Sequence, residues 1–206
     1  KLMMDIYSSA PADGKGASRP ALIFINGVGD PPDGGLRTWG AYRSWARLAA
    51  VSGWVAVNFQ ARHGEANAED VRDALLHLVR QGRDYGIDPT SLAIWACSAN
   101  VGAALPLISE DSPVRLKAAV LYYGGGELPH PKADLPVLVV RAGKDSAQLN
   151  ERLGGMFQSA LGANARWELI NVPLAHHAFD ILDDTQESRD IIRQTLDFLS
   201  NRLAPN

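Results

Sequence analysis

Residues 91–105 read Ser-Leu-Ala-Ile-Trp-Ala-Cys-Ser-Ala-Asn-Val-Gly-Ala-Ala-Leu, and they pass abruptly from a strand pattern to a helix pattern. The short apolar run predicts a buried strand over residues 91–96, and a helix is predicted over residues 99–108. Ser98 lies at the switch, where a hydroxyl can stand above the edge of a sheet beside the first amide groups of a helix. A serine that merely caps the helix fits this stretch equally well.

The same alternation of short apolar runs and amphipathic segments extends along the whole chain. Strands are predicted at residues 21–25, 54–59, 91–96, 116–123, 135–141 and 167–172, with residues 3–7 as a further edge strand. Helices are predicted at residues 39–51, 71–79, 99–108 and 148–161, and after a capping-box pair formed by Asp184 and Glu187. Apolar strands separated by helices predict an α/β fold, in which a mostly parallel, doubly wound sheet carries helices on both faces. We expect one domain over residues 1–206.

The composition restricts the class of protein. Of 206 residues, 46% are hydrophobic and 21% are charged, and 20 basic against 23 acidic side chains give a formal net charge of −3. These values are typical of a globular chain with a buried core. No apolar run is long enough to span a membrane, and no block of Lys or Arg suits a nucleic acid. Cys97 is the one cysteine, which excludes an internal disulfide and a zinc ribbon. The sequence is compatible with a cytoplasmic protein and with an exported one.

Three residue types that cooperate in nucleophilic catalysis follow three different predicted strands. They are Ser98, Asp145 and His177. The carboxyl ends of parallel strands meet at one edge of the sheet, so these side chains are expected to lie together. A serine hydroxyl needs a base that works near pH 7, which imidazole supplies, and a carboxylate fixes the tautomer of that imidazole.

Each of these residues also has an inert interpretation. Asp145 can cap a helix, and the adjacent His176 and His177 can be loop surface. The chain holds five histidines. Their spacing does not suit a metal site, so we expect no metal ion.

A glycine-rich turn, Asn26-Gly-Val-Gly29, follows the strand at residues 21–25 and can offer backbone N–H groups to an anion. A dinucleotide fingerprint would need a third glycine where Pro32 stands, and an acidic residue at the end of the next strand, where Asn58 and Gln60 stand. We therefore expect no nucleotide cofactor.

Five segments are similar to motifs of one large enzyme superfamily: Met4-Asp-Ile-Tyr7, Pro20-Ala-Leu-Ile-Phe-Ile-Asn-Gly27, Asp70-Val-Arg-Asp-Ala74, Tyr85-Gly-Ile-Asp-Pro-Thr-Ser-Leu-Ala-Ile94 and Ala175-His-His-Ala-Phe-Asp180. On these segments the chain resembles the α/β-hydrolases, and within them the small esterase and dienelactone-hydrolase-like branch. The superfamily uses a nucleophile, an acid and a histidine in this chain order.

The resemblance implies a role for each candidate residue. Ser98 matches the nucleophile and Asp145 the acid, and His177 matches the base because it stands two residues before Phe179. The oxyanion hole would use the backbone N–H of Ala99 and that of Gly27 or Val28. The implied activity is hydrolysis of a small carboxylic ester through an acyl-enzyme, with a small-molecule substrate and no cofactor. The oligomeric state stays open.

The chain departs from the superfamily pattern at the turn that carries the nucleophile. The motif G-x-S-x-G reads here as Ala96-Cys-Ser-Ala-Asn100, so both glycines are replaced. The oxyanion loop has Asn26 and Val28 where His and Gly are common. A hydrolase-fold protein that has lost its activity and serves as a binding or scaffold module is therefore an alternative. A peptidase or amidase of the same fold is another.

The segment after the predicted strand at residues 116–123 bears on substrate size. Many esterases of this superfamily insert a helical cap after the strand at residues 116–123. Here only residues 124–134, with three consecutive glycines and two prolines, precede the next strand. So short and broken a segment predicts an open site without a helical lid and a preference for short acyl chains.

Overall fold

The computed structural model describes residues 3–9, 17–27, 35–62 and 64–203, and its seven strands form one sheet in the order β1-β3-β2-β4-β5-β6-β7. Strand β1 runs antiparallel to β3, and all other neighbouring strands are parallel. The bounds are β1 (Met4–Tyr7), β2 (Arg19–Ile25), β3 (Val55–Phe59), β4 (Ile87–Cys97), β5 (Ala118–Tyr122), β6 (Val137–Ala142) and β7 (Trp167–Val172).

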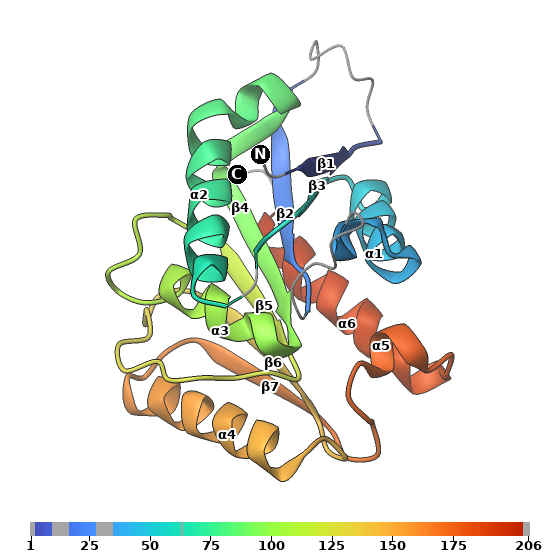
Figure 1. Ribbon diagram of the computed structural model, residues 1–206, viewed down its shortest axis with the longest axis vertical. Coiled ribbons are helices and arrows are strands. Elements are labelled where there is room, and N and C mark those ends of the chain that lie inside the picture. Colours follow the sequence, from blue (N-terminus) through green and yellow to red (C-terminus); the bar gives the residue numbers. More distant parts are fainter. Residues whose placement is uncertain (1–2, 10–16, 28–34, 63, 204–206) are drawn as a thin grey trace.

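Helices cover both faces of this sheet (Figure 1). Their bounds are α1 (Gly40–Val51), α2 (Ala66–Gln81), α3 (Val101–Ala104), α4 (Ala147–Gly162), α5 (Phe179–Leu182) and α6 (Gln186–Leu203). Helices α2, α3 and α4 lie along one face, and α1 and α6 lie along the other. The predicted fold class, a mostly parallel sheet with helices on both faces, is therefore confirmed.

Two apolar cores follow from the alternation of side chains along the strands. In β2, Ile23 and Ile25 face α2, α3 and α4, whereas Leu22 and Phe24 face α1 and α6. The first core is mainly aliphatic. The second is rich in aromatic rings, among them Trp45, Trp95, Tyr122, Tyr123 and Phe179. This aromatic core continues up to the carboxyl edge of the sheet, where the candidate site lies.

The predicted helix over residues 99–108 is wrong as a single element. The chain instead forms a 3₁₀ turn at Ser98–Asn100, one α-helical turn in α3, and a second 3₁₀ turn at Leu105–Leu107. Pro106 explains the break, because proline has no N–H to donate to the carbonyl four residues earlier and its ring crowds that carbonyl.

Two smaller predictions also need correction. The last helix is capped one residue later than predicted, since the Thr185 hydroxyl, and not Asp184, accepts the N–H of Ser188, at 3.1 Å. In α2, Val71, Leu75 and Leu78 are buried as predicted, but Val79 is exposed. Val79 lies about 80° around the helix from Val71, at the border of the buried face.

The connection between β5 and β6, residues 123–136, contains no helix. This agrees with the expected absence of a helical insertion at this point of the chain. Across the described residues, no helix is long and apolar enough to cross a membrane.

Candidate active site

Ser98, His177 and Asp145 meet at the carboxyl edge of the sheet, each after a different strand. Ser98 follows β4, Asp145 lies three residues after β6, and His177 lies five residues after β7. The Ser98 Oγ lies 2.8 Å from the His177 Nε2, and the His177 Nδ1 lies 2.6 Å from the Asp145 Oδ2. The three side chains form one continuous hydrogen-bonded chain.

The chemistry of these atoms sets the direction of both hydrogen bonds. An ionised carboxylate only accepts, so the proton of the neutral His177 ring is on Nδ1 and is donated to Asp145. The Nε2 atom then carries a lone pair and accepts the Ser98 hydroxyl proton. This is the arrangement in which imidazole can act as a general base on a serine.

The backbone at Ser98 is held in a left-handed conformation, with φ at 56°. Cys97 before it is extended and Val101 after it is helical, so the chain turns sharply at the serine. A non-glycine residue in this region costs about 1 kcal/mol or more, and such strain gathers at functional sites. Gly124 makes the turn possible, since a Cβ at that position would collide with the carbonyl oxygen of Ser98 and with Val101.

Asp145 is positioned by the loop that it belongs to. Its side chain is only 7% exposed, and its Oδ1 accepts the N–H of Ser146 at 2.7 Å. The hydroxyl that caps α4 belongs to Ser146, which accepts the N–H of Leu149. Asp145 therefore does not cap the helix with its carboxylate, and its Oδ2 is left to bind His177.

The loop of His177 is tied to the loop of Asp145 through the backbone. The N–H of Lys144 donates to the carbonyl of Ala175 at 2.9 Å. Beyond His177, the ring of Phe179 is buried and stacks on Tyr122, at 6.0 Å between ring centroids. These contacts fix both ends of the histidine loop.

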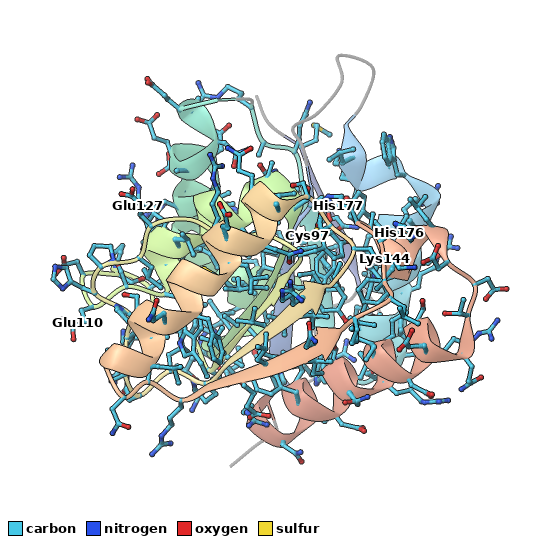
Figure 2. The ribbon with its side chains drawn as sticks, turned by 90° about the horizontal axis from the view of Figure 1, so that it is seen from below. Cys97, Glu110, Glu127, Lys144, His176 and His177 are labelled. Atoms are coloured by element: carbon cyan, nitrogen blue, oxygen red, sulfur yellow. The ribbon has the colours of Figure 1, made fainter. Side chains whose placement is uncertain are left out.

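Of the two adjacent histidines, His177 is the one that contacts both candidate partners. Its side chain is 36% exposed and faces Ser98 and Asp145, whereas His176 is an exposed residue of the same loop. Figure 2 labels both, together with Lys144 and Cys97, and draws Glu110 and Glu127 well apart from them. His77 on α2 instead pairs with the hydroxyl of Tyr85 at 3.1 Å.

The three oxyanion-hole candidates have different surroundings. Ala99 lies in the 3₁₀ turn at the start of the short helical segment, where backbone N–H groups point outward. The N–H of Gly27 donates to the hydroxyl of Tyr42 at 3.2 Å, so it is engaged within the protein. Val28 lies outside the described residues. Ala99 and Val28 are left as the candidate donors.

Asn100, which replaces a glycine of the superfamily motif, links three elements. Its Nδ2 donates to the carbonyl of Asn26 at the end of β2, at 2.5 Å, and its Oδ1 accepts from the Nδ2 of Asn67 on α2, at 3.2 Å. All three asparagines are buried. The φ of Asn100 is −84°, a conformation open to any residue, so the glycine is not required here.

Asn67, Asn100 and Tyr42 were not among the residues singled out from the sequence as contributing to the site. The sequence holds only a weak sign of the roles of Asn67 and Tyr42. Both occupy inward positions of amphipathic helices, where a buried polar group needs a hydrogen-bond partner. The identity of that partner could not be read from the sequence.

Cys97 lies next to the candidate nucleophile but faces the aromatic core. It is buried, with its Sγ at 3.7 Å from the hydroxyl of Tyr42. Burial raises the pKa of the Cys97 thiol well above its usual range, so the thiolate that a cysteine nucleophile requires is disfavoured.

In the part of the chain that the structure describes, no three His, Cys, Asp or Glu residues are grouped so that they could hold a metal ion.

Comparison with known proteins points to one architecture. No protein-family model and no curated protein matches the chain. Among solved structures, Thermogutta terrifontis esterase 2 phosphoramylated by tabun matches with a TM-score of 0.77 at 19% identity, covering 100% of this chain and 92% of the other. The native form of that esterase matches with a TM-score of 0.77 over 100% and 90% of the chains at 19% identity.

This chain has the α/β-hydrolase fold. The butyrate-bound form of the same esterase is also similar, with a TM-score of 0.75 at 18% identity and coverage of 100% and 91%. At such identities the likeness establishes the fold of the chain. The dienelactone-hydrolase-like branch of the sequence resemblance stays a prediction.

Proposed function

We propose that the protein is a serine hydrolase that cleaves small carboxylic esters, with Ser98 as nucleophile, His177 as base and Asp145 as the acid that orients the base. The observation that carries this proposal is the continuous chain from the Ser98 hydroxyl through the His177 ring to the Asp145 carboxylate, at 2.8 and 2.6 Å. The strained, partly exposed serine at the head of that chain supports the same conclusion, because structural serines rarely need such a backbone.

The reaction follows from the protonation states of the three groups. The Ser98 Oγ attacks the acyl carbon of the ester while its proton passes to the His177 Nε2, and a tetrahedral intermediate forms. His177 then gives this proton to the alcohol oxygen, the bond from carbon to that oxygen breaks, and an acyl-enzyme remains. Water then attacks the acyl carbon while the His177 Nε2 takes one of its protons. His177 gives this proton to the Ser98 Oγ as the bond from the acyl carbon to Oγ breaks, which releases the carboxylic acid and restores the serine.

The negative charge of the tetrahedral intermediate needs donors on the side opposite His177. We assign this role to the backbone N–H groups of Ala99 and Val28. Preorganised donors of this kind are worth about 2.7–4 kcal/mol each in transition-state stabilisation. Gly27 is not assigned to the hole, because its N–H already donates to the hydroxyl of Tyr42.

The substrate is proposed to be a small-molecule ester with a short acyl chain, handled by a single hydrolase domain. The described strands all belong to one sheet, and the loop at residues 123–136 supplies no helix to cover a long chain. The similar Thermogutta terrifontis esterase 2 has been solved with propionate and with butyrate bound, which supports a short acyl group by analogy.

A fluorophosphonate probe tests this proposal directly. The probe should form an adduct on the peptide that contains Ser98, located by mass spectrometry, and Ser98→Ala should abolish it. Turnover of p-nitrophenyl acetate should fall by about 10⁶-fold in Ser98→Ala, as in other serine triads. The neighbouring Cys97→Ala variant is the matched control and should keep both the adduct and most of the turnover.

If the wild-type protein is folded but forms no adduct and turns over no activated ester, the proposed activity is wrong. The engaged N–H of Gly27 favours the alternative in that case, a binding module that keeps the fold without the reaction. An adduct on Cys97 in place of Ser98 would overturn the assignment of the nucleophile.

A further inference from the structure

Asp180 is a second carboxylate close to the histidine, and the triad does not use it. It lies in α5, three residues after His177, and both of its oxygens accept hydrogen bonds from neutral donors. The Tyr123 hydroxyl donates to Oδ1 at 2.7 Å, and the Trp45 Nε1 donates to Oδ2 at 2.9 Å. No Lys or Arg of the described ranges forms an ion pair with Asp180, so the carboxylate is held without a structural counter-ion.

Tyr123 connects this carboxylate to the catalytic ring. Its ring packs edge-to-face against His177, with 4.8 Å between centroids and 62° between planes. The same ring contacts Phe179 at 6.0 Å. The backbone of Tyr123 has a φ of 36°, a left-handed conformation that a bulky residue adopts only when its surroundings enforce it.

The donors come from parts of the chain that are far apart. Trp45 belongs to α1 and is 135 residues from Asp180 in sequence, and Tyr123 follows β5 and is 57 residues away. Asp180 therefore joins the histidine loop to α1 and to the end of β5. A neutral hydrogen-bond acceptor could link the same elements. An ionised carboxylate at this position links them and also places a negative charge in the aromatic core.

We propose that Asp180 and Tyr123 are positioning residues for His177. The Tyr123 ring forms a wall that keeps the imidazole turned toward Ser98 and Asp145. Asp180 anchors that wall through the Tyr123 hydroxyl and supplies a second negative charge near the His177 ring. The proposal rests on the function proposed above. Its consequence for the reaction is that the imidazolium formed when Ser98 gives up its proton is stabilised by two carboxylates, Asp145 directly and Asp180 at longer range.

The surroundings of Asp180 act on its charge in two directions. The pKa of Asp180 is raised above its ordinary value, chiefly by burial, while the hydrogen bonds from Tyr123 and Trp45 and the positive charge of a protonated His177 act the other way and favour the ionised form. The ionisable groups that face Asp180 or His177 from the packed elements are Tyr42, Cys97, Tyr122, Tyr123 and Asp145. Burial raises the pKa values of Tyr42, Cys97, Tyr122 and Tyr123, so these four stay neutral at working pH. Asp180, Asp145 and His177 are the groups whose charges matter.

The sign of the expected effect follows from this pairing. Asp180 favours the protonated form of His177, so the Asp180→Asn substitution should make that form less stable. The acid limb of the kcat/KM profile should then move to lower pH, by about 0.5 pH unit. At the pH optimum kcat should fall about tenfold while KM changes less than about threefold, because the loss concerns the transition state and the geometry of the base.

The experiment compares three variants. Asp180→Asn removes the charge, Tyr123→Phe keeps the ring but removes the hydroxyl that holds Asp180, and Asp184→Asn removes a carboxylate that is 89% exposed on the same segment. The pH profile of p-nitrophenyl acetate hydrolysis and an NMR titration of the His177 ring are measured for each. We expect the shift in Asp180→Asn, a reduced kcat in Tyr123→Phe, and wild-type behaviour in Asp184→Asn.

The NMR titration separates this inference from the proposed function, because it needs no turnover. If the wild-type protein shows neither activity nor a probe adduct, the proposed function is wrong. A lower titration midpoint of His177 in Asp180→Asn than in wild type would still support the charge coupling in that case. A folded Asp180→Asn protein with a wild-type midpoint and wild-type kcat overturns the inference. If Asp180→Asn does not fold, Tyr123→Phe decides: this variant loses only the hydroxyl that binds Asp180, and an unchanged kcat overturns the inference that Asp180 positions His177 through Tyr123.

Discussion

At the scale of single residues, Ser98 and His177 each have a neighbour of similar chemistry that is differently placed. Ser98 is partly exposed and bound to a base, whereas Cys97 is buried beside Tyr42. His177 contacts Ser98 and Asp145, whereas His176 is exposed. In both pairs the residue's direction out of the backbone, rather than its intrinsic reactivity, determines which side chain can act.

The adjacent histidines, His176 and His177, give the prediction at the residue scale. His177→Ala should reduce kcat for p-nitrophenyl acetate by several orders of magnitude, because no other described base lies at the Ser98 hydroxyl. His176→Ala should stay within about threefold of wild type, and its thermal stability should hardly change, since surface substitutions are usually within about 0.5 kcal/mol. The measurement is steady-state turnover of both purified variants. Loss of activity in His176→Ala with an active His177→Ala would reverse the assignment of the base.

At the scale of elements, two buried polar contacts hold the loops that carry the site. Asn100 joins the end of β2 and the turn after β4 to α2. Asp70, also on α2, binds the loop after β3 through two groups of Arg62: the backbone N–H at 2.7 Å and the guanidinium at 2.6 Å. Helix α2 is thus the element to which two loops at the carboxyl edge are tied.

Asn100→Ala should destabilise the fold, because it leaves the carbonyl of Asn26 and the amide of Asn67 buried without this partner. An unsatisfied buried group costs about 1–3 kcal/mol, and we expect a loss of unfolding free energy in that range. Urea unfolding measures it. Asn171→Ala is the matched control, since Asn171 is an exposed asparagine whose Oδ1 accepts from Arg141 at 2.8 Å. Equal stability of the two variants would mean that Asn100 does not clamp the loop.

The Asp70–Arg62 contact gives a pH-dependent prediction. The hydrogen bonds from the Arg62 side chain hold the pKa of Asp70 below its ordinary value of 3.8. A carboxyl whose pKa is lower in the folded state stabilises the fold above its unfolded pKa, and this contribution is lost as the pH falls through the folded pKa. Asp70→Asn should therefore be less stable than wild type at pH 7, and the difference should shrink at pH values below 3.8.

Urea unfolding of both proteins across this range measures the effect. Asp73→Asn replaces an exposed aspartate on the same helix that forms an ion pair with its neighbour Arg72, and it should show no such pH dependence. A stability difference between wild type and Asp70→Asn that stays constant down to acid pH would contradict the ion-pair explanation.

At the scale of the whole molecule, the parallel sheet determines where the site can lie. Strands β4, β5, β6 and β7 are neighbours in the sheet, so the loops that follow them open on one edge. The loop after β5 carries Tyr123 and then continues without a helix to β6. A cavity of about 650 Å³ lies further along this loop, lined by Gly126, Leu128, Arg152 and Met156.

The open edge gives the last prediction. Acetyl to butyryl p-nitrophenyl esters should have the highest kcat/KM, because little apolar surface is available to bury a longer chain and each buried CH₂ contributes at most about 0.8 kcal/mol. No activation should occur at a lipid–water interface. A series of esters from two to sixteen carbons checks this. A kcat/KM that rises beyond about twelve carbons would indicate that the cavity beside α4 accepts the chain, and the open-site proposal would fail.

The sequence by itself determined the approximate places of the strands, their mostly parallel arrangement and the three residues worth testing. Most strands contain an apolar run of a few residues, which is a local signal, and the helices between strands favour parallel pairing. Ser98, Asp145 and His177 could then be named from their places after β4, β6 and β7. Pro106, which breaks the helix after Ser98, is likewise a local signal in the sequence.

Only the tertiary structure decided which polar groups support these residues. The partner of Gly27 is Tyr42, the partners of Asn100 are Asn26 and Asn67, and the donors to Asp180 come from α1 and the end of β5. Such pairs are separated by 15 to 135 residues, and no periodicity in the sequence specifies them. The physical reason is that a hydrogen bond requires its atoms within about 3 Å, so it depends on the packing of whole elements rather than on local propensity.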